Sequence, residues 1–254
     1  MSGNPPTRRM FAAALSSLAL NKLVAQSAPQ GAPNRLLSRP GAMPAAMLPP
    51  GLHPLGLRTD RDALLYVPEA SAKLEKAPLV ISLHGASGKA DRGINLLRAE
   101  SDKHGFLLLA PDTSRGTWDI INGRGGPDAK FIDSSLARVF AQARVDPARI
   151  AMAGISDGGT TALSLGLANG DLFNAVLAFS PGFIVDLPRA GKPPVFISHG
   201  TLDTILPIDE TSRRIVPALK REGYKVTYRE FEGPHTLPPD VGAEAMQWYM
   251  DLRA

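Results

Sequence analysis

Short apolar runs alternate with longer segments of helical periodicity from about residue 60 onward, and this alternation sets the fold class. Several of the runs are apolar throughout and bounded by Gly or Pro, which is typical of strands covered on both faces. Strand–helix alternation predicts a mostly parallel sheet flanked by helices, an α/β fold with right-handed crossovers. The predicted strands are residues 63–67, 79–83, 106–110, 150–153, 175–179, 195–198 and 226–231; the predicted helices are 94–104, 131–143, 160–168, 210–222 and 241–252.

Composition and charge exclude several classes of function. The chain has no cysteine, so disulfide scaffolds, thiolate metal sites and cysteine nucleophiles are ruled out. Six of its 28 basic residues precede the first acidic residue, Asp60, so the rest carries 22 basic and 24 acidic side chains, a net charge of −2. Nucleic-acid binding requires clustered Lys and Arg, and we therefore expect no nucleic-acid partner.

The N-terminus resembles an export signal. Arg8 and Arg9 precede a weakly apolar run over residues 10–20, with no acidic residue nearby, as in twin-arginine signal peptides. That run is too short to span a bilayer of about 30 Å as a helix, so no membrane span is expected. We predict a signal peptide over residues 1–28, and hence export to the periplasm or medium. The alternative is a disordered extension and a cytoplasmic protein.

A proline-rich segment separates this N-terminus from the alternating pattern. Residues 29–58 contain seven prolines without periodicity, which indicates a linker or a loosely packed lead-in. The predicted catalytic domain is residues 59–254.

A Gly-x-Ser-x-Gly motif stands between a predicted strand and a predicted helix. The chain reads Gly154-Ile155-Ser156-Asp157-Gly158-Gly159 immediately after the strand at 150–153. A serine on so tight a turn needs strained backbone angles, and side chains at Gly154 and Gly158 would collide with neighbouring backbone. In this context Ser156 is the predicted nucleophile.

A serine nucleophile needs a base and an acid that orients the base. His235 follows the last predicted strand, so in a parallel sheet it reaches the same edge as Ser156 and is the predicted base. Asp203 follows the strand at 195–198, which gives the order Ser–Asp–His, and it is the predicted orienting acid. Asp209, the competitor, is the expected cap of the next helix. The other histidines, His53, His84, His104 and His199, are less suitably placed as a base.

The predicted oxyanion hole consists of two backbone N–H groups. One belongs to Asp157, next to the nucleophile, and the other to Ala86 in the loop after the strand at 79–83, with Ser87 as a possible substitute. The longest irregular stretch, residues 112–130, contains Trp118. We expect Trp118 to offer an apolar face to the substrate; the alternative is that it only packs this loop.

Together these residues resemble a known superfamily. His84-Gly85 after a strand, the Ser156 motif, Asp203 and His235 look like an α/β-hydrolase, over roughly residues 60–254. Within it, the run Asp146-Pro147-Ala148-Arg149-Ile150 before the Ser156 motif resembles the phospholipase/carboxylesterase group and the esterases related to polyhydroxyalkanoate depolymerases and feruloyl esterases. The secreted relatives often contain disulfides, so a chain without cysteine favours a simple esterase.

The resemblance and the residues imply a serine carboxylesterase that acts on small-molecule or oligomeric esters without a metal or organic cofactor. Residues 181–194 are too few for a lid domain, so an open site is expected. The same triad would serve a thioesterase or a peptidase, and a noncatalytic binding protein on this fold is the alternative of a different class. The sequence leaves the oligomeric state open.

Overall fold

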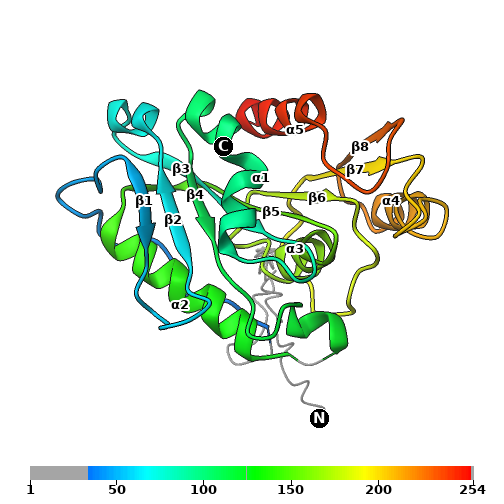
Figure 1. Ribbon diagram of the computed structural model, residues 1–254, viewed down its shortest axis with the longest axis horizontal. Coiled ribbons are helices and arrows are strands. Elements are labelled where there is room, and N and C mark those ends of the chain that lie inside the picture. The colour runs from blue at the N-terminus through cyan, green and yellow to red at the C-terminus, as the bar shows by residue number, and fades with distance from the viewer. Residues whose placement is uncertain (1–33, 124, 253–254) are drawn as a thin grey trace, which may run out of the picture.

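The computed structural model describes residues 34–123 and 125–252, and its centre is a single eight-stranded sheet in the order β1-β2-β4-β3-β5-β6-β7-β8 (Figure 1). Strands β3 to β8 are mutually parallel, whereas β2 is antiparallel to both β1 and β4. The predicted signal peptide lies outside the described residues. The strands are β1 (Gly51–Pro54), β2 (Leu64–Val67), β3 (Ala77–Leu83), β4 (Leu107–Ala110), β5 (Val145–Ile155), β6 (Ala175–Phe179), β7 (Val195–Gly200) and β8 (Val226–Phe231).

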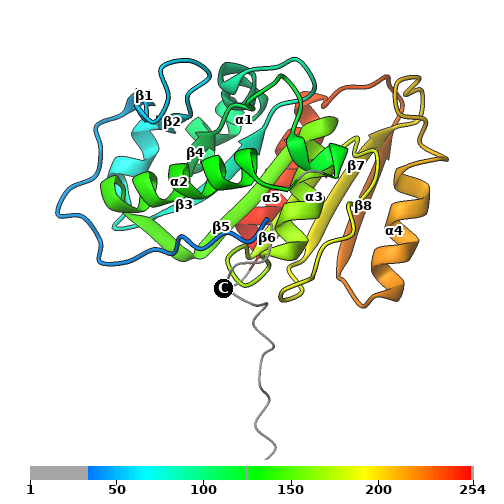
Figure 2. The same ribbon diagram turned by 90° about the horizontal axis from the view of Figure 1, so that it is seen from below.

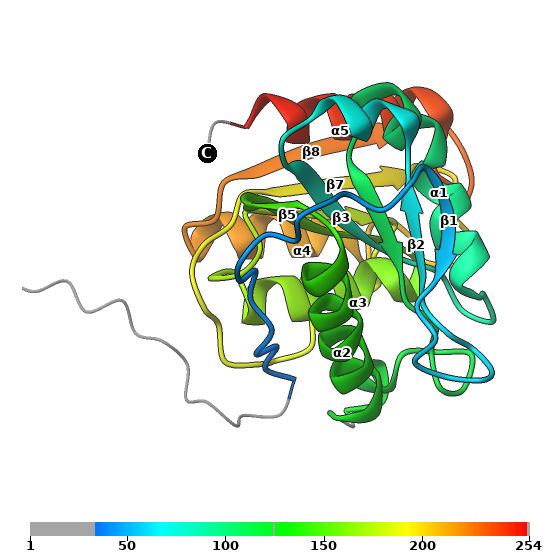
Figure 3. The same ribbon diagram turned by 90° about the vertical axis from the view of Figure 1, so that its left-hand side faces the viewer.

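Helices cover both faces of this sheet, as an α/β-hydrolase fold requires. Figure 3 shows α1 and α5 on one face and α2, α3 and α4 on the other, and Figure 2 shows the second group side by side. The central strands are therefore buried on both sides, which explains why β4 and β6 are apolar throughout, whereas the edge strand β8 alternates in exposure. The helices are α1 (Ala90–His104), α2 (Pro127–Gln142), α3 (Asp157–Ala168), α4 (Ser212–Arg221) and α5 (Pro239–Asp251), with short 3-10 turns at Glu69–Lys73 and Asp119–Asn122.

The predicted strands and helices are all present, with two informative differences. Strand β5 begins at Val145 rather than at residue 150, because its register with β3 shifts around Pro147 and lets the chain bulge without leaving the sheet. Strand β1 was not predicted. Its single proline, Pro54, is tolerated because β1 is an edge strand, paired only with β2.

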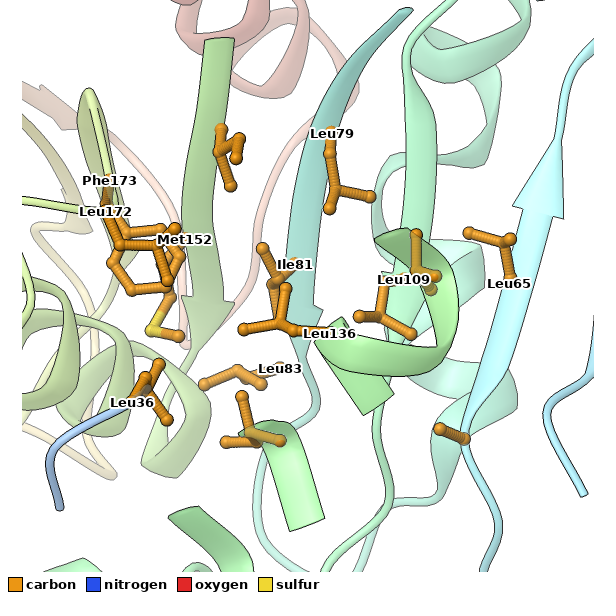
Figure 4. Close-up of a cluster of buried hydrophobic side chains, with 14 of the residues drawn as sticks. Leu36, Leu65, Leu79, Ile81, Leu83, Leu109, Leu136, Met152, Leu172 and Phe173 are labelled. Atoms are coloured by element: carbon orange, nitrogen blue, oxygen red, sulfur yellow. The ribbon is translucent and has the colours of Figure 1, made fainter. Parts of the chain in front are cut away.

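The segment before residue 59 contributes to the packed body. Leu36 is fully buried and points into the same apolar cluster as Met152 and Phe173 (Figure 4). Its backbone N–H donates to the Asn169 side chain across 2.8 Å, and the Arg35 guanidinium pairs with Asp171. Part of the predicted lead-in therefore packs against the end of α3, through long-range contacts that leave no periodic pattern in the sequence.

No helix in the described ranges has both the length and the apolar character needed to cross a bilayer.

Candidate active site

Ser156 occupies the sharp turn between β5 and α3 and has a strained backbone. Its φ and ψ angles are 60° and −122°, a region that residues with a side chain rarely adopt. Two hydrogen bonds hold the turn: the Ser156 N–H donates to the Phe179 carbonyl across 2.9 Å, and the Ser156 carbonyl accepts from the Thr160 N–H across 2.9 Å. The hydroxyl is thereby fixed at the carboxyl end of β5, where parallel sheets place their sites.

The glycines of the motif permit the close packing of this turn. A Cβ added to Gly154 would lie 2.3 Å from the Gly158 carbonyl oxygen, and one added to Gly158 would lie 2.2 Å from the Leu83 carbonyl oxygen. Real Cβ atoms do not approach backbone this closely, so only glycine fits at both positions. This agrees with the collision predicted from the sequence.

His235 and Asp203 meet at the same edge of the sheet. Asp203 follows β7, and His235 lies between β8 and α5; His235 Nδ1 donates to Asp203 Oδ2 across 2.6 Å. The other carboxylate oxygen accepts from the backbone N–H groups of Ile205 and Leu206 across 2.9 and 2.8 Å. Because Nδ1 carries the donated hydrogen, a neutral His235 presents Nε2 as its proton acceptor.

The environment of Asp203 favours its ionised form. Burial of this carboxyl by itself raises its pKa, but the hydrogen bonds from the Leu206 N–H and from His235 outweigh burial and hold the pKa below its usual range. A buried carboxylate beside Nδ1 of His235 stabilises the imidazolium that forms when Nε2 takes a proton.

The Nε2 atom of His235 is buried and has no hydrogen-bond partner within the described ranges. Ser156 and His235 both lie at the carboxyl edge of the sheet, but no hydrogen bond joins them in this structure. Catalytic hydrogen bonds are often long in a site without substrate and tighten when it binds.

A second imidazole approaches the same carboxylate, which the sequence did not predict. His199 is fully buried at the end of β7, with Nε2 2.8 Å from the Leu206 carbonyl oxygen and 3.1 Å from Asp203 Oδ2. Its Nδ1 lies 2.7 Å from the Ser212 hydroxyl. Because a carbonyl only accepts, Nε2 must carry the hydrogen, so Nδ1 accepts from Ser212. Burial lowers the pKa of His199 and keeps this imidazole neutral. His199 is therefore enclosed behind the acid and is not placed to act as a base.

The loop of residues 84–88, after β3, lies directly against Ser156. A Cβ added to Gly85 would be 3.3 Å from Ser156 Cβ and 3.8 Å from Ser156 Oγ. In the described part of the chain, the Ala86 N–H has no acceptor, whereas the Ser87 N–H donates to the Gly116 carbonyl across 2.6 Å. Because the Ser87 N–H is already bonded to Gly116, the Ala86 N–H is the one of the two that could donate to a substrate oxygen.

The expectation that Trp118 faces the substrate is corrected by the structure. Trp118 is 0% exposed, and its Nε1 donates to the His84 carbonyl across 2.9 Å. Its ring centroid lies 5.0 Å from that of His84. A fully buried side chain cannot offer a face to a substrate. Trp118 packs instead against His84 at the start of the 84–88 loop, which is close to the alternative role, packing within its own loop.

Thr117, the neighbour of Trp118, does reach the site. Its hydroxyl donates to Asp157 Oδ2 across 2.6 Å, which ties the 112–130 stretch to the start of α3. A cavity of about 250 Å³ opens beside this contact. It is lined by Ser114, Arg115, Thr117, Asp119, Asn122, Pro127 and Asp128.

The remaining candidates lie in structural contacts. Asp209 pairs with Arg213 on the surface, with 2.8 Å between Asp209 Oδ1 and Arg213 Nη1, and its side chain makes no capping hydrogen bond to α4. On α1, His104 Nε2 lies 3.4 Å from Glu100 Oε2. At the edge strand β1, His53 Nε2 lies 2.8 Å from the Pro49 carbonyl oxygen. Within residues 34–123 and 125–252, no group of three or more His, Asp or Glu is arranged to hold a metal ion.

The described part of the chain has no lid over this edge. The 181–194 segment instead lies against α3: the Gly182 N–H donates to the Thr160 hydroxyl, and the Val185 N–H donates to the Ser164 hydroxyl.

Comparisons with known proteins point to esterases and to the same fold. The Esterase PHB depolymerase family model matches residues 62–185. A curated relative, described as putative esterase NocK of Nocardia uniformis subsp. tsuyamanensis, is 28% identical over 191 residues, which are 67% of this chain and 53% of the relative. The chain thus spans about half the length of the curated relative that it matches.

Solved structures of similar fold include two esterases. The crystal structure of esterase PE8 has a TM-score of 0.61 and 26% identity, covering 74% of this chain and 97% of that one. A phospholipase/carboxylesterase from Dyadobacter fermentans has a TM-score of 0.58 and 22% identity, covering 74% and 96%, and supports the fold. The sheet order, the helical layers and these matches together show that the chain has an α/β-hydrolase fold and is similar to esterases of that fold.

Proposed function

We propose that the protein hydrolyses carboxylic esters through an acyl-enzyme on Ser156, with His235 as base and Asp203 as the orienting acid. The observation that carries this proposal is the pairing of His235 Nδ1 with the buried Asp203, which leaves Nε2 without a partner at the sheet edge that also holds Ser156. The strain in the Ser156 backbone supports the same assignment, because strained residues cluster at active sites.

The reaction has two halves. In the first, Ser156 Oγ attacks the acyl carbonyl while His235 Nε2 takes the hydroxyl proton, and the N–H groups of Ala86 and Asp157 stabilise the oxyanion. His235 then gives that proton to the leaving alcohol. In the second half, His235 removes a proton from water, which attacks the acyl carbonyl; the bond to Ser156 Oγ then breaks, His235 returns the proton to Oγ, and the acid is released.

The open edge of the sheet favours substrates whose ester bond is accessible. The name of the matching family suggests hydroxybutyrate oligomers as one of the first substrates to test, together with short-chain esters. We infer that the cavity beside Thr117 receives one side of the substrate, because Thr117 lines it and donates a hydrogen bond to Asp157, the residue after Ser156.

Active-site labelling tests the proposal. A fluorophosphonate should label the protein on Ser156, and Ser156→Ala should lose labelling and several orders of magnitude in turnover of p-nitrophenyl esters without unfolding. The control is Ser134→Ala, which removes an exposed serine of α2 and should change neither the labelling nor the turnover of p-nitrophenyl esters. Hydrolysis retained by Ser156→Ala would refute the assignment. Faster turnover of acyl-CoA or peptide anilides than of esters would favour a thioesterase or a peptidase.

We further propose that the mature protein is exported. The support is the Arg8-Arg9 pair followed by a short apolar run, and residues 59–254 would form the catalytic domain behind it. N-terminal sequencing of protein recovered from the periplasm or medium should find a start near residue 29. An intact Met1 in that fraction would contradict the proposal.

A further inference from the structure

The position of the 84–88 loop controls one of the two oxyanion donors. Ala86 lies between Gly85, which faces Ser156, and Gly88, whose N–H donates to the Gly85 carbonyl across 3.1 Å. The loop is therefore a tight turn, and a displacement at Gly88 is passed on to the segment that faces the nucleophile.

An arginine from a distant part of the sequence holds this turn. Arg61, which precedes β2, donates from Nη2 to the Gly88 carbonyl across 2.9 Å. The same guanidinium donates from Nε to the Thr113 carbonyl across 2.6 Å and from Nη2 to the Thr113 hydroxyl across 3.1 Å. Only a planar group with several donors bridges the 84–88 loop and the 112–130 stretch in this way.

A buried carboxylate completes the arrangement. Asp112 Oδ1 lies 2.6 Å from Arg61 Nη2, and the two side chains are 3% and 21% exposed. His84 Nε2 lies 3.3 Å from the same oxygen, without the alignment of a hydrogen bond. Burial raises the pKa of Asp112, but the contacts with His84 and Arg61 outweigh burial and lower it, so this carboxyl is ionised. Without Arg61, an unpaired charge would remain behind the loop.

The backbone of Arg61 is also strained. Its φ is 52°, in the left-handed region that a long side chain rarely adopts. Such a conformation persists only where surrounding contacts hold it, and it is found mainly at functional sites. Here the contacts are the bond from the Arg61 N–H to Asp60 Oδ1, across 2.9 Å, and the guanidinium bonds to the 84–88 loop and to Thr113.

We propose that Arg61 is a positioning residue that, paired with Asp112, fixes the Ala86 N–H in its oxyanion-binding orientation. The inference rests on the proposed function, because it assumes an oxyanion next to Ser156. Arg61 touches neither substrate nor nucleophile in this account. Its effect passes through the Gly88 carbonyl, and it should therefore change transition-state stabilisation more than ground-state binding.

The test compares Arg61→Ala with Arg144→Ala. Arg144 is a suitable control because it is also half-buried and donates to backbone carbonyls, those of Pro44 and Ala45, away from the site. Arg61→Ala should lower kcat by about 10- to 100-fold with little change in KM, as a small misplacement of a catalytic group does. Its affinity for a boronic acid that mimics the tetrahedral intermediate should fall in parallel, whereas Arg144→Ala should keep both values.

Two further measurements separate positioning from general destabilisation. Free guanidinium ion at low millimolar concentration should restore part of the kcat of Arg61→Ala, because it can occupy the vacated space beside Asp112, and should not affect Arg144→Ala. If Arg61→Ala does not fold, Arg61→Lys serves instead. Its ammonium keeps the charge beside Asp112 but cannot bridge Gly88 and Thr113 in the same geometry, so kcat should still fall.

The outcomes distinguish this inference from the proposed function. Suppose that Ser156→Ala is inactive but that Arg61→Ala or Arg61→Lys has the kcat and KM of the native protein. This result would overturn the role of Arg61 and leave the proposed function intact. A Ser156→Ala variant that still hydrolyses esters would overturn both. A fall in kcat with unchanged KM, weaker boronic acid binding and guanidinium rescue would establish the positioning role.

Discussion

His235 Nδ1 and Asp203 Oδ2 lie 2.6 Å apart, and the Asp203 side chain is completely buried. Two backbone N–H groups bind the other oxygen of this carboxylate, and His199 approaches the same oxygen as His235 from behind. The Asp203 carboxylate is thus held from several directions, and His235 is its partner on the side that faces the sheet edge. This arrangement fixes the tautomer of the imidazole as well as its position.

Replacing the acid tests that role. Asp203→Asn nearly preserves the volume of the side chain but removes the charge that stabilises the imidazolium, and its amide would favour the wrong tautomer of His235. We expect kcat/KM to fall by about 10⁴-fold, as in serine hydrolases generally. Ester hydrolysis by purified Asp203→Asn checks this, with Asp209→Asn as the control on the surface. Equal losses in the two variants would contradict the assignment of the acid.

The strained backbone at Ser156 predicts a trade-off between stability and activity. Glycine adopts a φ of 60° and a ψ of −122° with much less strain than a residue with a Cβ. Ser156→Gly should therefore be more stable than Ser156→Ala by about 1 kcal/mol, while both are inactive. Chemical denaturation of the two variants measures the difference. A less stable glycine variant would show that this turn is relaxed in solution.

Gly85 should control access to the nucleophile without determining stability. A methyl group at Gly85 would lie 3.3 Å from Ser156 Cβ and 3.5 Å from the Ile155 carbonyl oxygen, so the neighbours must shift by a few tenths of an ångström. We expect Gly85→Ala to lose about tenfold or more in kcat with a small change in Tm. Gly182→Ala, whose methyl group finds ordinary contacts from 3.5 Å, is the matched control. Similar kinetics in both variants would argue against this placement of the loop.

The ion pair of the N-terminal segment should make stability depend on acid pH. Burial raises the pKa of Asp171, but hydrogen bonds from Arg35 and Arg39 prevail and lower it to about 2. Because the folded-state pKa is depressed, this stabilisation is complete above the ordinary pKa of 3.8 and is lost as the pH falls towards 2. The Tm difference between the native protein and Asp171→Asn should therefore shrink between about pH 5 and pH 2. A difference that stays constant over this range would contradict the contact.

The sequence predicted those parts of the site that follow strands. Ser156, Asp203 and His235 each follow a predicted strand, and the carboxyl ends of parallel strands share one edge, so their approach to a common edge follows from topology. The core strands were recognisable for a related reason: burial on both faces makes them apolar throughout.

The remaining features depend on contacts that leave no local pattern. Arg61 reaches Gly88 and Thr113 through side-chain bonds between segments that only the fold brings together. The burial of Trp118 likewise depends on where the His84 carbonyl lies, and the approach of His199 to Asp203 depends on a turn after β7. Such polar contacts are set by tertiary geometry rather than by periodicity, and the sequence predicted none of them.

The most direct measurement is the kinetic comparison of Ser156→Ala, His235→Ala and the double variant, with folding of each confirmed by thermal melting. If the two residues act as a unit, either single variant should lose several orders of magnitude in kcat/KM, and the double variant should lose little more. Losses that multiply, or a Ser156→Ala variant that keeps its activity, would show that hydroxyl and imidazole act independently and would contradict the proposed triad.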